Sequence, residues 1–68
     1  METFAKRFKE LREEKGLNQT QLAKELGFSS RTISSYETGR GESDFQTLTR
    51  LCKFFDVTAG YLIGIEEF

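Results

Sequence analysis

The chain has 68 residues, a formal net charge of −1, a single cysteine, and neither histidine nor proline. This length suits one domain, residues 1–68, and the composition excludes an internal disulfide, a histidine general base and the usual zinc-finger ligand sets. No apolar run approaches the ~18 residues of a membrane span, and the first residues do not resemble a signal peptide. We therefore expect a cytoplasmic protein that binds no metal or cofactor and no membrane.

Apolar residues recur at helical spacing along the whole chain, and strand patterns are absent. The sequence therefore predicts an all-α fold. The expected helices span residues 4–15, 19–26, 30–38, 45–55 and 59–63. Candidate N-caps stand before or at the start of each helix: Thr3, Asn18, Ser29, Ser43 or Asp44, and Thr58.

The stretch from Gln19 to Tyr36 has the residue pattern of a helix-turn-helix. Two helices joined by a turn of three or four residues must nearly touch, so the first needs a small side chain, and Ala23 supplies it. The turn needs a residue that tolerates a left-handed backbone, which is Gly27. Apolar residues stand on both sides of this turn, at the helical spacing that would pack the second helix against the rest of the domain: Leu22, Leu26, Phe28, Ile33 and Tyr36. An ordinary helical hairpin is the alternative.

The outward face of the second helix in this pair is polar, small and almost free of acid. A solvated helix face usually carries Glu and Lys, whereas hydroxyl groups and one arginine suit a surface that lies against base-pair edges. The charge distribution is a weaker indication: residues 1–41 hold eight basic and six acidic residues, whereas residues 42–68 hold two and five. The pattern predicts binding to double-stranded DNA. The outward residues are Ser30, Arg31, Thr32, Ser34 and Ser35.

Motifs along nearly the whole chain, from about Phe4 to Gly64, resemble the Cro/C1-type (XRE) helix-turn-helix family. The resemblance implies a compact five-helix bundle, the lambda-repressor-like DNA-binding domain, whose third helix enters the major groove. Members are bacterial or phage-encoded transcriptional regulators, usually repressors, that bind pseudo-palindromic operators as homodimers. The matching residues are Leu11-Arg12, Gly16-Leu17-Asn18-Gln19, Leu22-Ala23, Gly27, Ile33-Ser34, Tyr36-Glu37-Thr38-Gly39-Arg40, Leu48, Leu51, Val57 and Tyr61-Leu62-Ile63-Gly64.

Positions that contact DNA in the family can be carried over residue by residue. Arg31 is able to form a bidentate bond with O6 and N7 of guanine, and its alternative is a phosphate contact that carries no sequence information. Thr32 can also offer its methyl group to thymine. The resemblance assigns base contacts to Ser30, Arg31, Thr32 and Ser35. It assigns phosphate contacts, or support of the contacting residues, to Asn18, Gln19, Ser34, Thr38 and Arg40; a solvated first-turn residue is the alternative for Gln19.

Arg12 and Glu37 match residues that form an ion pair in the family and join the first helix to the end of the third. Such a pair would fix the orientation of the recognition helix, although desolvation offsets much of its Coulombic gain. Two unrelated surface charges are the alternative. The loop after Arg40 departs from the family, which usually carries a basic residue and a proline there, because it reads Gly41-Glu42-Ser43-Asp44 and brings two carboxylates close to the expected phosphate path. We therefore expect modest affinity for DNA that depends on dimerisation.

An apolar patch on the C-terminal side is expected from Phe54, Tyr61, Ile65 and Phe68. Dimer contacts often lie there in the family, and a simple extension of the core is the alternative. Cys52 stands where the family has a small core residue, so we expect a buried structural thiol. The sequence shows no catalytic constellation and predicts a protein that is not an enzyme. The second functional hypothesis is a protein-interaction module of the same fold, of the antitoxin or antirepressor type, which the net charge of −1 favours.

Overall fold

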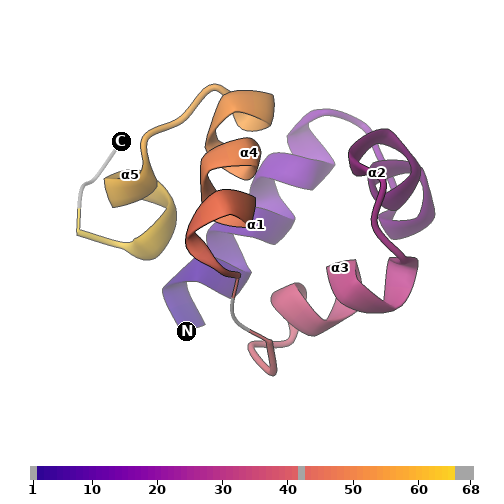
Figure 1. Ribbon diagram of the computed structural model, residues 1–68, viewed down its shortest axis with the longest axis horizontal. Coiled ribbons are helices and arrows are strands. Elements are labelled where there is room, and N and C mark those ends of the chain that lie inside the picture. Colours follow the sequence, from indigo (N-terminus) through magenta and orange to yellow (C-terminus); the bar gives the residue numbers. More distant parts are fainter. Residues whose placement is uncertain (1, 42, 66–68) are drawn as a thin grey trace.

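The computed structural model describes residues 2–41 and 43–65 of the chain (Figure 1). No β-strand occurs in this described part, so the all-α prediction is confirmed. None of its helices is both long enough and apolar enough to cross a membrane. Five helices follow one another: α1 (Glu2–Glu14), α2 (Gln19–Leu26), α3 (Ser30–Glu37), α4 (Phe45–Phe55) and α5 (Ala59–Ile63).

The helix bounds of α2, α4 and α5 are those expected from the sequence, whereas α1 and α3 differ slightly. α1 begins at Glu2, so Thr3 lies inside the helix and the prediction that Thr3 caps it is wrong. The helix extends in this direction because neither glycine nor proline interrupts it there. α1 ends at Glu14, one residue early, and α3 ends at Glu37 with Thr38 as its C-cap.

Side-chain caps begin the four helices that follow α1. Asn18 and Gln21 form the expected capping box: the Asn18 side chain accepts from the Gln21 backbone N–H at 2.7 Å, and the Gln21 side chain accepts from the Asn18 N–H at 2.9 Å. Because each cap satisfies backbone donors that the helix itself leaves unpaired, the start of each helix is defined locally. The capping residues are Asn18, Ser29, Asp44 and Thr58.

The helix-turn-helix lies at one end of the molecule, and α5 lies at the other (Figure 1). α3 packs against both α1 and α2, whereas α5 packs against α1 and α4. α1 therefore contacts both ends, and it carries the packing that holds α3 in place. This arrangement leaves the face of α3 that points away from α1 without a covering helix in the described chain.

One hydrophobic core joins all five helices. Phe8 of α1 lies at its centre, where its ring meets Tyr36 of α3 and Phe55 of α4 edge-on, with centroid separations of 5.8 and 5.7 Å. Such aromatic pairs contribute about 0.5–1.5 kcal/mol each beyond the area that they bury. Each helix also supplies one completely buried side chain, and these are Phe8, Leu22, Ile33, Leu51 and Leu62.

Cys52 is half-buried, so the expectation of a buried thiol holds only in part. Its side chain packs against the core on one side and borders a shallow surface groove on the other. Burial raises the pKa of the Cys52 thiol above its ordinary value, so the thiol is protonated at neutral pH.

Four described glycines lie in the left-handed region of the backbone, and two of them, Gly27 and Gly64, are C-cap residues. Gly27 follows α2 with φ 77°, and open space surrounds the position that a Cβ atom would take. Gly64 follows α5 with φ 96°, and there a Cβ atom would lie 2.7 Å from Cγ2 of Thr3. The end of α5 thus approaches the first turn of α1 closely, which links the two ends of the sequence.

We expect Gly64→Ala to destabilise the protein more than Gly27→Ala. A left-handed alanine costs about 1–2 kcal/mol at either position, but only at Gly64 does the new methyl group also collide with Thr3. Urea unfolding of both variants measures the difference. In a Thr3→Ser background, which removes Cγ2 but keeps Cβ at 3.1 Å, the difference between the two losses should shrink; equal losses in the unaltered background would show that the contact with Thr3 is not tight.

Candidate nucleic-acid interface

The turn between α2 and α3 has the geometry that the sequence predicts for a helix-turn-helix. Gly27 and Phe28 both donate their backbone N–H to the carbonyl of Ala23, which closes the end of α2. Ala23 is buried and Ile33 is completely buried, so α2 and α3 pack closely at the expected positions.

α3 is held from behind, which leaves its outward face available. Ile33 and Tyr36 are the buried residues of this helix. On the other side, Ser30 and Arg31 are exposed, whereas Thr32, Ser34 and Ser35 are half-buried. The first turn of α3 contains no acidic residue. The structure therefore places the predicted base-contacting residues on one helix, with Ser30 and Arg31 the most accessible.

Two hydroxyl groups at the ends of α3, those of Thr32 and of the C-cap residue Thr38, already have partners within the protein. The Thr32 hydroxyl lies 3.0 Å from that of Ser29, the N-cap residue. The Thr38 hydroxyl donates to the backbone carbonyl of Ser35 at 3.2 Å, so a contact of Thr38 with phosphate would require this hydroxyl to rotate. The same carbonyl accepts from the backbone N–H groups of Arg40 and Gly41, both at 3.1 Å. The loop that follows α3 is thus folded back against its last turn.

Arg31 and Arg40 are the cations closest in sequence to this face, and both are exposed. Neither forms an ion pair or a hydrogen bond through its side chain with residues 2–41 or 43–65. An arginine without an internal partner keeps its five N–H donors available to bases or phosphates.

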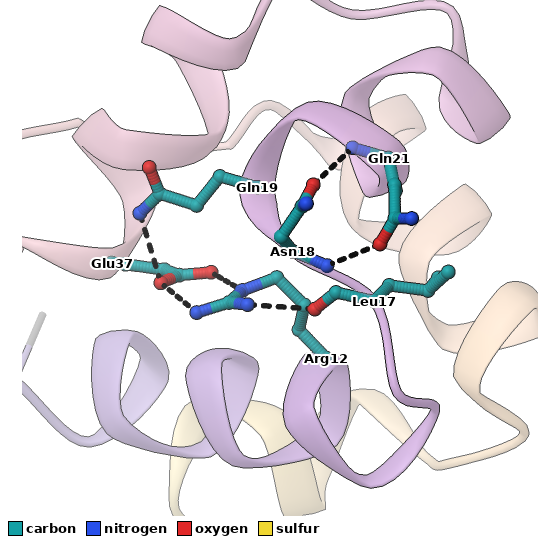
Figure 2. Close-up of polar contacts among 6 residues, drawn as sticks. All are labelled: Arg12, Leu17, Asn18, Gln19, Gln21 and Glu37. Atoms are coloured by element: carbon teal, nitrogen blue, oxygen red, sulfur yellow. Dashed lines mark hydrogen bonds and ion pairs between the residues drawn. The ribbon is translucent and has the colours of Figure 1, made fainter.

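Behind the outward face, α1 and α3 are joined by an ion pair between Arg12 and Glu37 (Figure 2). Arg12 Nε donates to Glu37 Oε2 at 2.6 Å, and Nη2 donates to Oε1 at 3.1 Å. Both side chains are almost completely buried, with exposed fractions of 11% and 4%. The hydrogen bond with Glu37 raises the pKa of Arg12; the Coulombic attraction of Glu37 acts in the same direction, whereas burial opposes it.

Two further hydrogen bonds extend this ion pair into the segment that leads into α2. Arg12 Nη1 donates to the carbonyl of Leu17 at 2.7 Å, and Gln19 Nε2 donates to Glu37 Oε1 at 3.2 Å (Figure 2). Gln19 therefore holds Glu37 by a hydrogen bond, whereas the roles expected for it, a phosphate contact or support of a DNA-contacting side chain, stay predictions. We refer to Arg12, the Leu17 carbonyl, Gln19 and Glu37 as the Arg12–Glu37 network. Among the described residues, no buried side-chain nitrogen or oxygen lacks a hydrogen-bond partner.

Sequence reasoning missed Arg50, which connects α4 to the turn of the helix-turn-helix. Its Nη2 donates to the carbonyl of Leu26 at 2.6 Å, and its guanidinium carbon lies 5.1 Å from the centroid of the Phe28 ring. Leu26 ends α2, so its carbonyl has no partner within the helix. The sequence could not indicate the hydrogen bond, because Arg50 and Leu26 are 24 positions apart. The only local indication of a contact with a cation is Phe28, the aromatic residue in the turn.

Asp44 brings negative charge to the start of α4, close in sequence to the candidate DNA-binding face of α3. Hydrogen bonds from the backbone and side chain of Thr47 hold the pKa of Asp44 below its ordinary value, so its carboxylate is ionised at neutral pH. Burial raises the pKa of Tyr36, and the charge of Asp44 adds to that effect. Glu42, the other acidic residue expected here, lies outside the described residues.

The predicted apolar patch on the C-terminal side is only partly exposed. Phe54 is half-buried against Phe55, and the ammonium group of Lys15 lies 5.0 Å from its ring centroid. The guanidinium of Arg7 covers the ring of Tyr61, which is also half-buried. Ile65 is 79% exposed. Phe68, the remaining residue of the predicted patch, lies outside the described residues.

A family model described as Helix-turn-helix matches residues 8–62 of the chain. The chain belongs to the Cro/C1-type (XRE) helix-turn-helix family. This assignment agrees with the resemblance found in the sequence and with the turn geometry between α2 and α3.

Several similar proteins are named as transcriptional regulators. The HTH-type transcriptional activator BcrR of Enterococcus faecalis is 39% identical over 64 residues, which cover 94% of this chain and 31% of BcrR. The HTH-type transcriptional regulator ImmR of Bacillus subtilis is 32% identical over 65 residues, or 96% of this chain and 51% of ImmR. The phage repressor RstR of Vibrio cholerae is 31% identical over 64 residues, or 94% and 58%. The chain thus spans about a third to somewhat over half of these relatives.

Removal of one member of the ion pair should destabilise the protein strongly. Arg12→Met leaves the buried carboxylate of Glu37 without its cation, which costs about 3–5 kcal/mol in comparable pairs. Arg12→Lys keeps the charge but loses the bidentate geometry, so its loss should be intermediate. The double variant Arg12→Met/Glu37→Met should recover most of the stability. Urea unfolding measures all three, and a loss below about 1 kcal/mol for Arg12→Met would indicate an ordinary surface pair.

Arg50 and Phe28 should be energetically coupled. We expect Arg50→Met to cost about 1–2 kcal/mol, because it removes the donor to the Leu26 carbonyl and the contact with the ring. Lys53→Met, on an exposed position of the same helix, serves as the control and should cost less than about 0.5 kcal/mol. A double-mutant cycle with Phe28→Leu should give a coupling energy of about 0.5–1 kcal/mol. Additive losses would show that the two side chains do not interact.

Proposed function

We propose that this protein is a sequence-specific regulator of transcription that binds double-stranded DNA as a homodimer, with α3 in the major groove. The observation that supports this most directly is the outward face of α3, which carries hydroxyl groups and one exposed guanidinium while the helix is held rigidly from behind. Membership in the helix-turn-helix family and the names of the relatives point to the same role.

Arg31 is the residue that we expect to read sequence. It stands in the first turn of α3, is exposed, and makes no side-chain ion pair within the described chain, so its fork of donors can meet O6 and N7 of a guanine. Thr32 should contribute its methyl group to a thymine contact, because its hydroxyl group is engaged with Ser29. Ser30 and Ser35 can accept or donate to several bases and should therefore discriminate weakly.

Contacts with phosphate should place the helix in the groove. Gln19 donates one hydrogen of its amide nitrogen to Glu37, which leaves the second hydrogen for a phosphate oxygen. Arg40 is exposed in the loop after α3 and can supply a further cation. Because Asp44 carries negative charge nearby, we expect one copy of the chain to bind weakly and two copies to be needed for stable binding.

We propose that the protein acts in the bacterial cytoplasm and represses transcription rather than activating it. Repression would follow because the bound protein occludes a promoter. A helix that occupies the major groove denies the same bases to other proteins. The relatives support both outcomes by name, since RstR is a repressor and BcrR an activator.

A protein-interaction module is the second candidate function, as expected for an antitoxin or antirepressor of this fold. The observation that favours it is the acidic second part of the chain, where residues 42–68 hold five acidic and two basic residues. Salt distinguishes the two functions, because DNA binding through several phosphates weakens steeply as salt rises.

Selection of binding duplexes from a randomised pool, at low and at physiological salt, tests the proposed function. We expect enrichment of an inverted repeat whose half-sites are centred about 10 base pairs apart, the separation of major grooves on one face of DNA. If the protein is folded and enriches no sequence, sequence-specific DNA binding is refuted and the protein-interaction function takes its place.

Arg31→Ala should weaken binding to the selected duplex by about 1–3 kcal/mol and relax the preference at one base position in each half-site. Lys24→Ala, which alters an exposed cation in the last turn of α2, is the control and should leave the base preference unchanged. Titrations against duplexes substituted one position at a time give both quantities. An equal loss on every duplex, with a salt dependence reduced by about one phosphate contact, would show that Arg31 contacts the backbone instead.

A further inference from the structure

The most exposed large apolar side chain in the described chain is Phe45, the first residue of α4, at 83%. An isolated exposed leucine or isoleucine needs no explanation, but an aromatic ring in water forgoes the burial of about 150–250 Å² of surface. The ring of Phe45 also stands at the edge of a groove, so its exposure is part of a larger surface feature.

This groove runs along α4 and continues beyond its end to Ala59, with a volume of about 380 Å³. Its lining is mostly apolar, with Leu48, Cys52 and Val57 as side chains that are half-buried and accessible from the groove. The outer side of α4 therefore combines a protruding ring and a hollow that accepts apolar groups.

Two opposite charges border the groove, Lys53 and Asp56. Both are exposed, and neither forms an ion pair with residues 2–41 or 43–65. A two-fold axis places a residue of one copy against a different residue of the partner, and the same pair occurs twice. A surface that carries a protruding ring, a groove that accepts it, and both signs of charge can therefore be complementary to a copy of itself.

The spacing along α4 is compatible with such symmetry. Cys52 lies seven residues after Phe45, about 10.5 Å along the helix axis at ~1.5 Å per residue. If two α4 helices pack antiparallel about an axis beside Cys52, Phe45 of one copy reaches the far end of the other groove, near Val57 and Ala59. In this arrangement Lys53, whose side chain leans toward the helix N-terminus, approaches the partner's Asp56.

We propose that the α4 face, defined as Phe45, Leu48, Cys52, Lys53, Asp56 and Val57, is the surface through which two copies of this chain associate. The proposal rests on the homodimer of the proposed function and names its contact surface, which differs from the C-terminal patch expected from the sequence. Stable complexes bury about 1,200–2,000 Å² in total. Two phenylalanine rings and their grooves reach only part of that area, so the dimer should be weak in free solution.

The single cysteine of the chain provides a direct probe of this surface. The test measures the mass of the free chain by sedimentation and the rate at which Cys52 reacts with excess maleimide, both over a range of micromolar to millimolar protein. We expect the reaction to slow at least fivefold over the concentrations at which the mass rises to that of a dimer, because the partner then covers the thiol.

Matched variants identify the surface. Phe45→Ser should raise the dissociation constant of the dimer at least tenfold and keep Cys52 reactive at high concentration. Ile65→Ser removes a side chain of similar exposure, 79%, that does not line the groove, and it should change neither quantity. Circular dichroism confirms that both variants fold.

A charge reversal tests the surface without altering Phe45. Lys53→Glu should weaken the dimer at low salt, and added salt should then strengthen it, since screening relieves the repulsion between the introduced carboxylate of one copy and Asp56 of the other. Asp56→Asn in the Lys53→Glu background should restore part of the affinity; asparagine suits this position because residue 56 has φ 57°.

Three results would overturn the proposal: a monomer throughout the concentration range, a dimer in which Cys52 reacts at the monomer rate, or a dimer that Ile65→Ser dissociates and Phe45→Ser does not. No DNA is present in this experiment, so its outcome is separate from that of the proposed function. A chain that dimerises through the α4 face and enriches no duplex refutes sequence-specific DNA binding alone. A chain that enriches an operator and ignores Phe45→Ser refutes the α4 face alone.

Discussion

We infer that the orientation of α3 depends on one buried ion pair. Arg12 and Glu37 are 25 positions apart, and their contact joins the chain's first helix to the last residue of α3. The same guanidinium binds the Leu17 carbonyl, and the same carboxylate accepts from Gln19, so one group of side chains positions α1, the entry to α2 and α3 together. A buried ion pair of this kind need not increase net stability, because desolvation opposes the Coulombic attraction. Its consequence is geometric, since the planar guanidinium accepts only a narrow range of carboxylate positions.

Because these contacts lie on the inner side of α3, the side chains of its outward face do not hold the helix in place, apart from the residues that cap it. Ile33 and Tyr36 fill the core, Glu37 holds the end of the helix, and Ser29 holds its start. The surface that remains is polar and carries few cations. We therefore expect a single copy to have limited electrostatic attraction to DNA, and we propose that stable binding requires two copies acting together. The α4 face is the surface that we propose for the contact between them.

Features that depend on residues within about four positions could be predicted from the sequence. The capping box of α2, the N-caps of α3, α4 and α5, the left-handed glycines and the small Ala23 belong to this group, because each answers a steric or hydrogen-bonding need of its own helix end. The Arg12–Glu37 contact was expected only through the family resemblance. The contacts of Arg50 with the turn, and of Gly64 with Thr3, were not predicted, since they arise from how separate helices pack. The exposure of Phe45 belongs with them: helical spacing alone does not say which side of α4 the other helices cover.

The central claim is that the face of α3 held by the Arg12–Glu37 network meets DNA, and amide chemical-shift mapping tests it most directly. Labelled protein would be titrated with the selected duplex and the shifts compared along the chain. We expect the largest changes at residues 29–35, at Gln19 and at Arg40, with small changes in α5. Largest changes over α5, with α3 unaffected, would contradict it, because the DNA-binding surface would then lie at the opposite end of the molecule from the helix-turn-helix (Figure 1).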